Sequence, residues 1–362
     1  MAKKIKAKSF ALYLKARTEF GFEKYCGHHK VIRYADGLPI YSIMLPPLCS
    51  EAYAHYEVIT DISARQNRPL PFLVSVALTD KCNIRCEHCS FYTSVDDPNK
   101  KVLSVDELKD AIVQSQNLGA SVINFVGGEP LMHPQWREVF ASVDKRRSHV
   151  FLFTNGWFLA ESANDIKAAG VGGVYASIDA STAEAHDKKR GKPGLFKKAI
   201  EGIAAAKKAG LTVGISCCID KEEFESGELD NIIEMGRREG VHEVLVFDAT
   251  PVGMYSSRED LWGNQEWLER MIAHVKKYNQ DEKYPGVLLY SYLSSYLGMG
   301  CAGGTIYYYI TPYGDICPCD FYHKTFGNVR EEKLAHIWDR MSQQLGAHGS
   351  SWTGCRAKQK HD

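Results

Sequence analysis

The sequence lacks any segment that is long and apolar enough to cross a membrane. No run reaches the roughly 18 consecutive apolar residues that a transmembrane helix needs. The N-terminal stretch MAKKIKAKSFALYLKAR is basic, but it has neither the apolar core nor the cleavage site of a secretory signal. We therefore expect a cytoplasmic, reducing compartment. A peripheral contact between this basic stretch and a membrane surface is an alternative to a helix packed on the protein.

An excess of charge of one sign is also missing. Lys and Arg together number 44, and Asp and Glu together also number 44, so no nucleic-acid partner is expected. The chain has no short repeats and no low-complexity segment. Its 362 residues, 44% of them hydrophobic, suit one large soluble domain or two smaller ones.

Cysteine, in contrast, is abundant. Eleven cysteines stand at positions 26, 49, 82, 86, 89, 217, 218, 301, 317, 319 and 355. An odd number in tight clusters fits a disulfide framework poorly, and in a reducing compartment such clusters usually bind metal or take part in redox chemistry. Cys217 and Cys218 are the exception, because the apolar run VGISCCID predicts that both are buried as small hydrophobic residues. Cys26, with His28 and His29, is interpreted as an ordinary site, since no second pair of ligands is apparent.

Apolar runs and helical patterns alternate along the middle of the chain. The predicted strands are 72–79, 121–127, 149–155, 172–179, 211–220 and 242–248. Helices are predicted between them, for example over 104–119, where Ser104 and Glu107 form a capping-box pattern. This alternation predicts an α/β fold with a parallel sheet. Six units are too few for a closed eight-stranded barrel, so we expect a partial, TIM-like (β/α)6 barrel with its chemistry at the C-terminal ends of the strands.

Changes in composition suggest three parts. Pro69 and Pro71 mark the end of an N-terminal extension, 1–72, in which two strands and a helix near 50–65 are expected. The partial barrel covers 73–285. Residues 286–362 are rich in Tyr, Gly and Cys and are predicted to form a small separate domain that ends in a helix.

The segment CNIRCEHC follows the first strand of the predicted barrel and holds Cys82, Cys86 and Cys89. Three thiolates with this spacing on a loop suit three corners of a cubic iron–sulfur cluster, which leaves one iron without a protein ligand. A structural zinc ion normally takes four protein ligands. A zinc site with a distant fourth ligand is the alternative at this point.

The cysteine motif and the motifs that follow it resemble those of the radical S-adenosylmethionine (SAM) enzymes. The likeness extends in order over about 73–250. It starts with the CX3CX2C signature, and the later motifs are FVGGEP, TNG, ASIDA and KKRGK. The SAM-site residues that the resemblance implies are Gly127, Gly128, Glu129, Pro130, Asn155, Ser177, Asp179 and Arg190.

The resemblance implies a 4Fe–4S cluster held by the three cysteines, with the amino and carboxylate groups of SAM on its fourth iron. Reductive cleavage of SAM would give methionine and a 5′-deoxyadenosyl radical that takes hydrogen from a substrate. Gly127 and Gly128 would let the backbone approach the ligand closely. Ser177 and Asp179 would contact the ribose or the carboxylate, and Arg190 would pair with the carboxylate as a bidentate fork.

The C-terminal segment resembles the start of the SPASM/twitch extension found on many radical SAM enzymes. Cys301 and Cys319 flank Gly314 with the spacing CX12GX4C. The resemblance implies an auxiliary 4Fe–4S cluster with Cys301, Cys319 and Cys355 as ligands. Cys317 is a candidate for the fourth ligand, and an open iron that binds substrate is the alternative. A full SPASM module carries seven cysteines, so this shorter set favours a twitch-like module with one auxiliary cluster.

These observations predict a radical SAM enzyme that oxidises a small metabolite or forms a bond within it. A ribosomally made peptide, crosslinked or epimerised, is the alternative substrate, and in an epimerase an unligated Cys317 is a candidate hydrogen donor. A zinc-binding scaffold without catalysis is the remaining interpretation. The resemblance also implies an electron donor such as flavodoxin or ferredoxin.

Overall fold

The computed structural model describes residues 29–91, 99–261, 265–295, 297–298, 300–345 and 355–358. The basic N-terminal helix, Cys26 and His28 lie outside these residues. Within them, no helix has the length and hydropathy needed to span a membrane.

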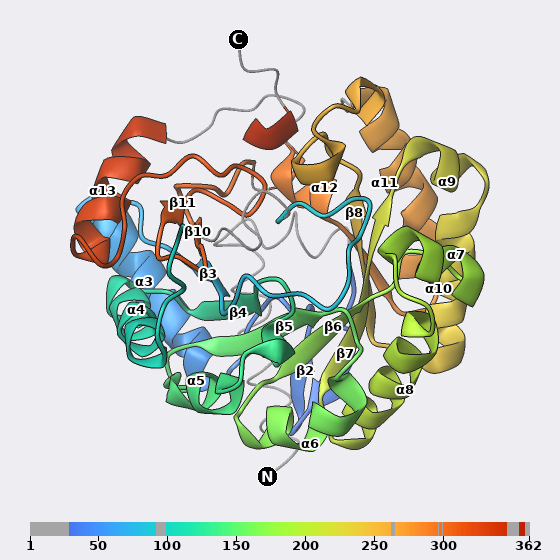
Figure 1. Ribbon diagram of the computed structural model, residues 1–362, viewed down its shortest axis with the longest axis horizontal. Helices are drawn as coiled ribbons and strands as arrows, with labels where there is room; N and C mark the ends of the chain where they lie inside the picture. The colour runs from blue at the N-terminus through green and yellow to red at the C-terminus, as the bar shows by residue number, and fades with distance from the viewer. Residues whose placement is uncertain are drawn as a thin grey trace.

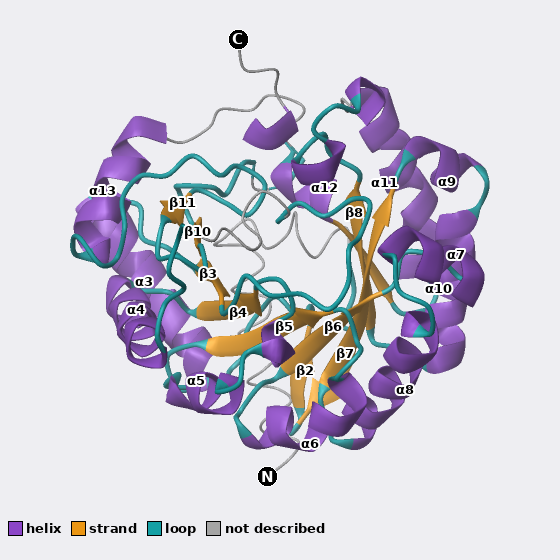
Figure 2. Ribbon diagram, viewed as in Figure 1, coloured by secondary structure: helices purple, strands orange, loops and turns teal. Residues whose placement is uncertain are grey.

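A single curved sheet forms the centre of the molecule (Figures 1 and 2). It has nine strands in the order β11-β10-β3-β4-β5-β6-β7-β8-β9. All neighbouring strands are parallel except the pair β10 and β11. The strands are β3 (Leu73–Ala77), β4 (Val122–Val126), β5 (His149–Thr154), β6 (Gly173–Ser177), β7 (Thr212–Ile219), β8 (Glu243–Asp248), β9 (Gly286–Leu289), β10 (Tyr307–Ile310) and β11 (Ile316–Cys317).

The helices lie around the outside of this sheet (Figure 2). They are α3 (Glu51–Gln66), α4 (Val105–Leu118), α5 (Trp136–Ser142), α6 (Leu159–Ala168), α7 (Ala183–Arg190), α8 (Leu195–Lys208), α9 (Lys221–Glu225), α10 (Glu228–Glu239), α11 (Gln265–Asn279), α12 (Tyr290–Ser294) and α13 (Leu334–Leu345), with short 3-10 turns η2 (Pro130–Met132), η3 (Gly253–Tyr255), η4 (Glu259–Leu261) and η5 (Arg356–Lys358). Helix α4 begins with the predicted capping box of Ser104 and Glu107 and ends at Gly119. The six predicted strands are β3 to β8, so the predicted α/β partial barrel is confirmed.

The C-terminal segment extends the barrel sheet instead of standing apart from it. Strand β10 pairs in parallel with β3, with Tyr308 opposite Val74, and the hairpin partner β11 forms the edge. The predicted C-terminal module thus contributes two strands to the barrel sheet, where β10 covers the open edge of β3. The predicted division at residue 285 stays a prediction. At that point of the chain the sheet continues, since β9 pairs with β8.

The N-terminal strands β1 (Arg33–Ala35) and β2 (Leu38–Ile40) form a hairpin that precedes α3. A buried carboxylate at the start of β8, Glu243, ties this segment to the barrel. Glu243 accepts hydrogen bonds from the Ile43 amide at 2.9 Å and from the Tyr175 hydroxyl at 2.5 Å, and it lies 2.7 Å from His29 Nε2. Glu243 thus holds the extension at the N-terminal end of the strands, opposite the end where chemistry is expected.

Candidate active site

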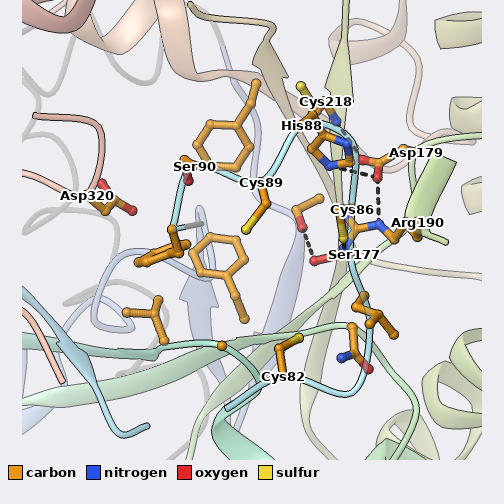
Figure 3. A pocket seen from close by; sticks show the side chains of 18 of the residues that line it. Cys82, Cys86, His88, Cys89, Ser90, Ser177, Asp179, Arg190, Cys218 and Asp320 are labelled. Atoms are coloured by element: carbon orange, nitrogen blue, oxygen red, sulfur yellow. Dashed lines mark hydrogen bonds and ion pairs between the residues drawn. The ribbon is translucent and has the colours of Figure 1, made fainter. Parts of the chain in front are cut away.

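One large cavity opens at the C-terminal ends of the strands. Its walls include the loop after β3 and residues from the ends of β4 to β8. Cys82, Cys86 and Cys89 all line it, and Figure 3 shows their side chains around the same space. The other predicted site residues that line it are Gly127, Gly128, Glu129, Pro130, Asn155, Ser177, Asp179 and Arg190. The structure therefore brings together every residue that the sequence placed at the SAM site.

The loop that carries the three cysteines is held first by the loop after β4. The amide of Gly128 donates to the Thr79 carbonyl at 2.9 Å, and the amide of Glu129 donates to the Lys81 carbonyl at 2.8 Å. A Cβ atom at Gly128 would lie only 2.1 Å from the Lys81 oxygen. The sequence predicted that these glycines admit a ligand. In the structure they admit the backbone of the cysteine loop.

Two further segments support the same loop. The amide of Glu87 donates to the Lys189 carbonyl at the end of α7, at 3.1 Å. The amide of Met254 donates to the Cys89 carbonyl at 3.1 Å, and a Cβ atom at Gly253 would lie 2.2 Å from that carbonyl oxygen. Backbone contacts from three directions therefore fix the positions of the cysteines before any ligand binds.

The donor set of this loop fits an iron–sulfur cluster. Burial raises the pKa of the Cys82 thiol to about 11 and that of the Cys86 thiol to about 12. Both thiols are therefore neutral without metal at neutral pH, and metal binding has to displace their protons. Three soft sulfur donors around one cavity suit iron.

Glu129 connects the loops that follow β4 and β5. Its buried carboxylate accepts hydrogen bonds from the Thr154 hydroxyl and the Asn155 amide, both at 2.7 Å, and from the Leu131 amide at 3.2 Å. Burial raises the pKa of Glu129 to about 7 although these hydrogen bonds lower it. The Asn155 side chain donates to Asn83 Oδ1 at 2.8 Å, which extends the connection to the cysteine loop.

Asp179 makes its contacts with protein groups. Its Oδ2 accepts from Arg190 Nε at 2.6 Å and lies 3.2 Å from His88 Nε2, and its Oδ1 accepts from the Cys218 amide at 2.8 Å (Figure 3). Burial opposes ionisation, but Arg190 and His88 outweigh it and hold the pKa of Asp179 well below its usual range. Both oxygens are thus engaged within the protein. The arrangement orients Arg190, whose Nη1 lies 3.9 Å from Cys86 Sγ.

The structure separates the two adjacent cysteines of β7. Cys217 is buried, and its Sγ lies 3.8 Å from the Leu245 carbonyl, as the apolar run predicted. Cys218 is partly exposed and lines the cavity. Cys217 lines the cavity as well, but only Cys218 is partly exposed, so the prediction that both are buried was wrong for Cys218.

His186 in α7 gives the region around Asp179 a pH dependence. It is fully buried, and its Nδ1 accepts a hydrogen bond from the Asp179 amide at 3.2 Å. Burial, with a smaller effect from Arg190, lowers the pKa of His186 from 6.5 to about 4. Between pH 6.5 and 4, the unfolded chain therefore binds a proton at His186 that the folded chain does not bind. We expect the apo protein to lose stability as the pH falls from 6.5 to 4, by roughly 3 kcal/mol at most from this residue.

Chemical denaturation of the apo protein at a series of pH values measures this loss. His186→Gln removes the titrating group, and the drop between pH 6.5 and 4 should become smaller than in the wild type. His336 is exposed, so His336→Gln is the matched control and should leave the drop unchanged. An identical drop in all three proteins would show that His186 is not the group that titrates.

A second cavity holds three of the C-terminal cysteines. Cys301, Cys319 and Cys355 line it together. Phe321 lines both this cavity and the first one, so the two sites are adjacent. Three soft donors on one cavity fit an auxiliary iron–sulfur cluster. Cys317 is not part of this group and packs in a separate cluster with Ala77, Val126 and Tyr309.

Sequence reasoning missed the apolar wall of the first cavity. Phe91, Phe153, Phe247 and Phe321 line it, and Asp320 lies across the cavity from Asp179 (Figure 3). The ring centroid of Phe247 lies 6.1 Å from that of Phe153 and 5.9 Å from that of Phe321. A signal was available for two of these residues, since the predicted strands HVFLFTN and HEVLVFD each carry Phe near the C-terminal end.

Comparisons with known proteins agree with this architecture. The sequence model of the Radical SAM superfamily matches residues 76–233, and that of the iron-sulfur cluster-binding domain SPASM matches residues 301–357. These two domains confirm the resemblance seen in the motifs. They imply SAM, a 4Fe–4S cluster that binds it, and an auxiliary iron–sulfur cluster.

Relatives with assigned activities support the same assignment. The chain is 28% identical over 290 residues to the AdoMet-dependent heme synthase of Methanosarcina barkeri. The aligned region covers 74% of this chain and 82% of the relative. It is 27% identical over 299 residues to the PqqA peptide cyclase of Rhizobium meliloti, and this alignment covers 78% of this chain and 77% of the cyclase. Among solved structures, Streptococcus suis SuiB bound to its precursor peptide SuiA matches with a TM-score of 0.63 and 15% identity, over 78% of this chain and 68% of SuiB. At that identity the last match shows the fold alone.

Proposed function

We propose that this chain, a member of the radical SAM superfamily with a SPASM domain, removes a hydrogen atom from a small, largely apolar metabolite. The reaction then oxidises that metabolite or forms a bond within it. The enzyme class follows from the family. The substrate class is the proposal, and the observation that carries it is the wall of four phenylalanines in the first cavity.

The residues of this chain divide between the two cofactor sites. Cys82, Cys86 and Cys89 hold the cluster that binds SAM, and the loop supports described above keep them in place. When bound and reduced, this cluster supplies the electron that cleaves SAM into methionine and a 5′-deoxyadenosyl radical. Arg190 uses Nε on Asp179, and its Nη1 faces Cys86 Sγ at 3.9 Å, so the guanidinium lies beside the cysteine loop, where it can pair with the SAM carboxylate. Asp179 thus acts through Arg190 and His88.

The remaining part of the cavity suits the substrate. Phe91, Phe153, Phe247 and Phe321 exclude water from a reactive radical and favour an apolar group. Asp320 is a partly buried acid on this side, and its Oδ1 lies 3.0 Å from the Tyr307 hydroxyl. Its second oxygen can accept a hydrogen bond from the substrate, which would orient an otherwise apolar molecule.

A peptide substrate is the second candidate. The similarity to a PqqA peptide cyclase along most of both chains favours it. An apolar or aromatic side chain of a peptide would meet the same phenylalanines. The two candidates differ in whether the rest of the substrate is a polypeptide.

The test is anaerobic. The protein is reconstituted with iron and sulfide, and 5′-deoxyadenosine is measured after addition of SAM and dithionite, with and without a low-molecular-mass extract of the source cells. If the proposal is right, the extract stimulates cleavage, protease treatment of the extract leaves the stimulation intact, and one small metabolite is consumed. Loss of stimulation on protease treatment would show that the substrate is a peptide and not a small metabolite. Absence of any SAM cleavage would overturn the activity itself.

A further inference from the structure

The cavity of the auxiliary cluster has one side without a cysteine. This inference rests on the proposed ligand set. Cys301, Cys319 and Cys355 line the cavity and can bind three of the four irons of a cubic cluster. Cys317, the expected fourth thiol, lies on β11 with its Sγ 4.0 Å from Thr325 Oγ1, and it does not line the cavity. No fourth cysteine of the described residues lines the cavity, so the fourth iron either binds a different group or stays open to substrate.

Only a few other side chains on this cavity carry an atom that can bind iron. They are Met44, Tyr290, Ser294 and Tyr307. The Tyr307 hydroxyl lies 2.8 Å from Ser75 Oγ and 3.0 Å from Asp320 Oδ1, so its hydrogen-bonding positions are in use. The Ser294 hydroxyl donates to the Ser291 carbonyl at 3.4 Å. The Met44 thioether is a neutral and weak donor.

Tyr290 differs from these residues. It is the first residue of α12, directly after β9, and its ring lies against Phe247, with centroids 4.9 Å apart, and Phe321, with centroids 5.8 Å apart. Burial, with smaller effects from Asp320 and the three thiols of the cavity, raises the pKa of Tyr290 well above its usual range, so metal binding has to displace the phenol proton. Among the described residues, no hydrogen bond to that hydroxyl is formed. The two phenylalanines therefore fix the ring on the wall of the cavity that the three cysteines line.

We propose that the Tyr290 oxygen is the fourth protein ligand of the auxiliary cluster. Ligation forms an iron–oxygen bond, breaks the phenol O–H bond and releases the proton to water, and no electron is transferred. Tyrosinate is a known protein ligand of iron. Because Phe321 touches both cavities, Tyr290 also places this corner of the cluster next to the wall of the substrate cavity.

The experiment isolates the auxiliary cluster. In a background of Cys82→Ala, Cys86→Ala and Cys89→Ala, the reconstituted protein should contain about four irons per chain. Tyr290→Phe is compared with Tyr292→Phe, a buried tyrosine of the same helix that does not line the cavity. The readouts are iron content, the electron paramagnetic resonance spectrum of the reduced cluster, and hyperfine coupling to added 13C-cyanide, which binds an iron that lacks a protein ligand.

We expect Tyr290→Phe to keep its iron, to shift its resonance spectrum and to gain cyanide coupling. The parent and Tyr292→Phe should share one spectrum and show no coupling. Identical spectra in all three proteins, or cyanide coupling already in the parent, would overturn the tyrosine ligand while leaving the cluster in place. No iron in the triple-alanine parent would show that the protein does not bind an auxiliary cluster. That result would contradict the auxiliary site and would not bear on the SAM-cleaving site.

Discussion

Cys86→Ala is expected to abolish SAM cleavage and to lower the iron content from about eight to about four per chain. Cys86 is the central cysteine of the loop, and its Sγ lies 3.9 Å from Arg190 Nη1. Its loss leaves two thiols, which do not hold a cubic cluster against exchange with solvent. Without the cluster there is no electron for SAM, so 5′-deoxyadenosine formation should fall to the level of the buffer. Iron analysis and chromatography of the product measure both effects.

The matched control is Cys49→Ala, which removes the same thiol from a partly buried position that packs against Tyr41, Leu48 and Tyr53 and lines neither cavity. We expect a loss of roughly 1 kcal/mol in stability from the small cavity, with iron content and cleavage unchanged. Residual cleavage by Cys86→Ala above the buffer level would contradict the ligand assignment. Loss of cleavage by Cys49→Ala as well would indicate that the assay reports folding and not ligation.

The residues that could be predicted from the sequence are those whose signal is local. Cys82, Cys86 and Cys89 lie within eight residues of one another, and the capping box of α4 spans four residues. Strands β3 to β8 each appear as a short apolar run. In a parallel sheet the loops after such runs meet at one edge, so the order of the motifs was enough to place them in one cavity.

The features that could not be predicted depend on contacts between distant parts of the chain. The Tyr307 hydroxyl meets Ser75 across 232 positions because β10 pairs with β3, and no local pattern encodes that pairing. The pairing of β11 with β10 places Cys317 in a cluster with Ala77, Val126 and Tyr309, apart from the three thiols of the second cavity. The resemblance had made Cys317 a candidate fourth ligand, with an open iron as the alternative.

At the first site, the contacts of Asp179 also depend on distant parts of the chain and could not be predicted from its motif. Its motif predicts that it lies at the SAM pocket, and it does line the cavity. Whether its oxygens remain free depends on His88, Arg190 and the Cys218 amide, which come from three different segments. The structure therefore favours a role for Asp179 in orienting Arg190 and His88, and the contact of any of them with SAM stays a prediction.

Gly128→Ala is expected to lower SAM cleavage by about 100-fold or more while the protein still folds. The added Cβ would lie 2.1 Å from the Lys81 oxygen and 2.5 Å from the Lys81 carbonyl carbon, both backbone atoms. No side-chain rotation relieves this overlap, so the cysteine loop has to move away from the loop after β4. A displacement on the order of 1 Å at a reacting centre costs about 100-fold in rate. The measurement is 5′-deoxyadenosine formation per iron bound.

Gly227→Ala separates this steric effect from a general loss of stability. Gly227 precedes α10 with φ +84°, and a Cβ atom there would meet no atom within 4 Å. Alanine is strained at that φ and should cost roughly 1 kcal/mol in stability, but it does not touch the cysteine loop, so cleavage should stay at the wild-type level. If Gly128→Ala cleaved SAM as fast as Gly227→Ala, the contact with Lys81 would not set the position of the cysteines. The hydrogen bond from the Glu129 amide to the same carbonyl would then be the contact that positions the loop.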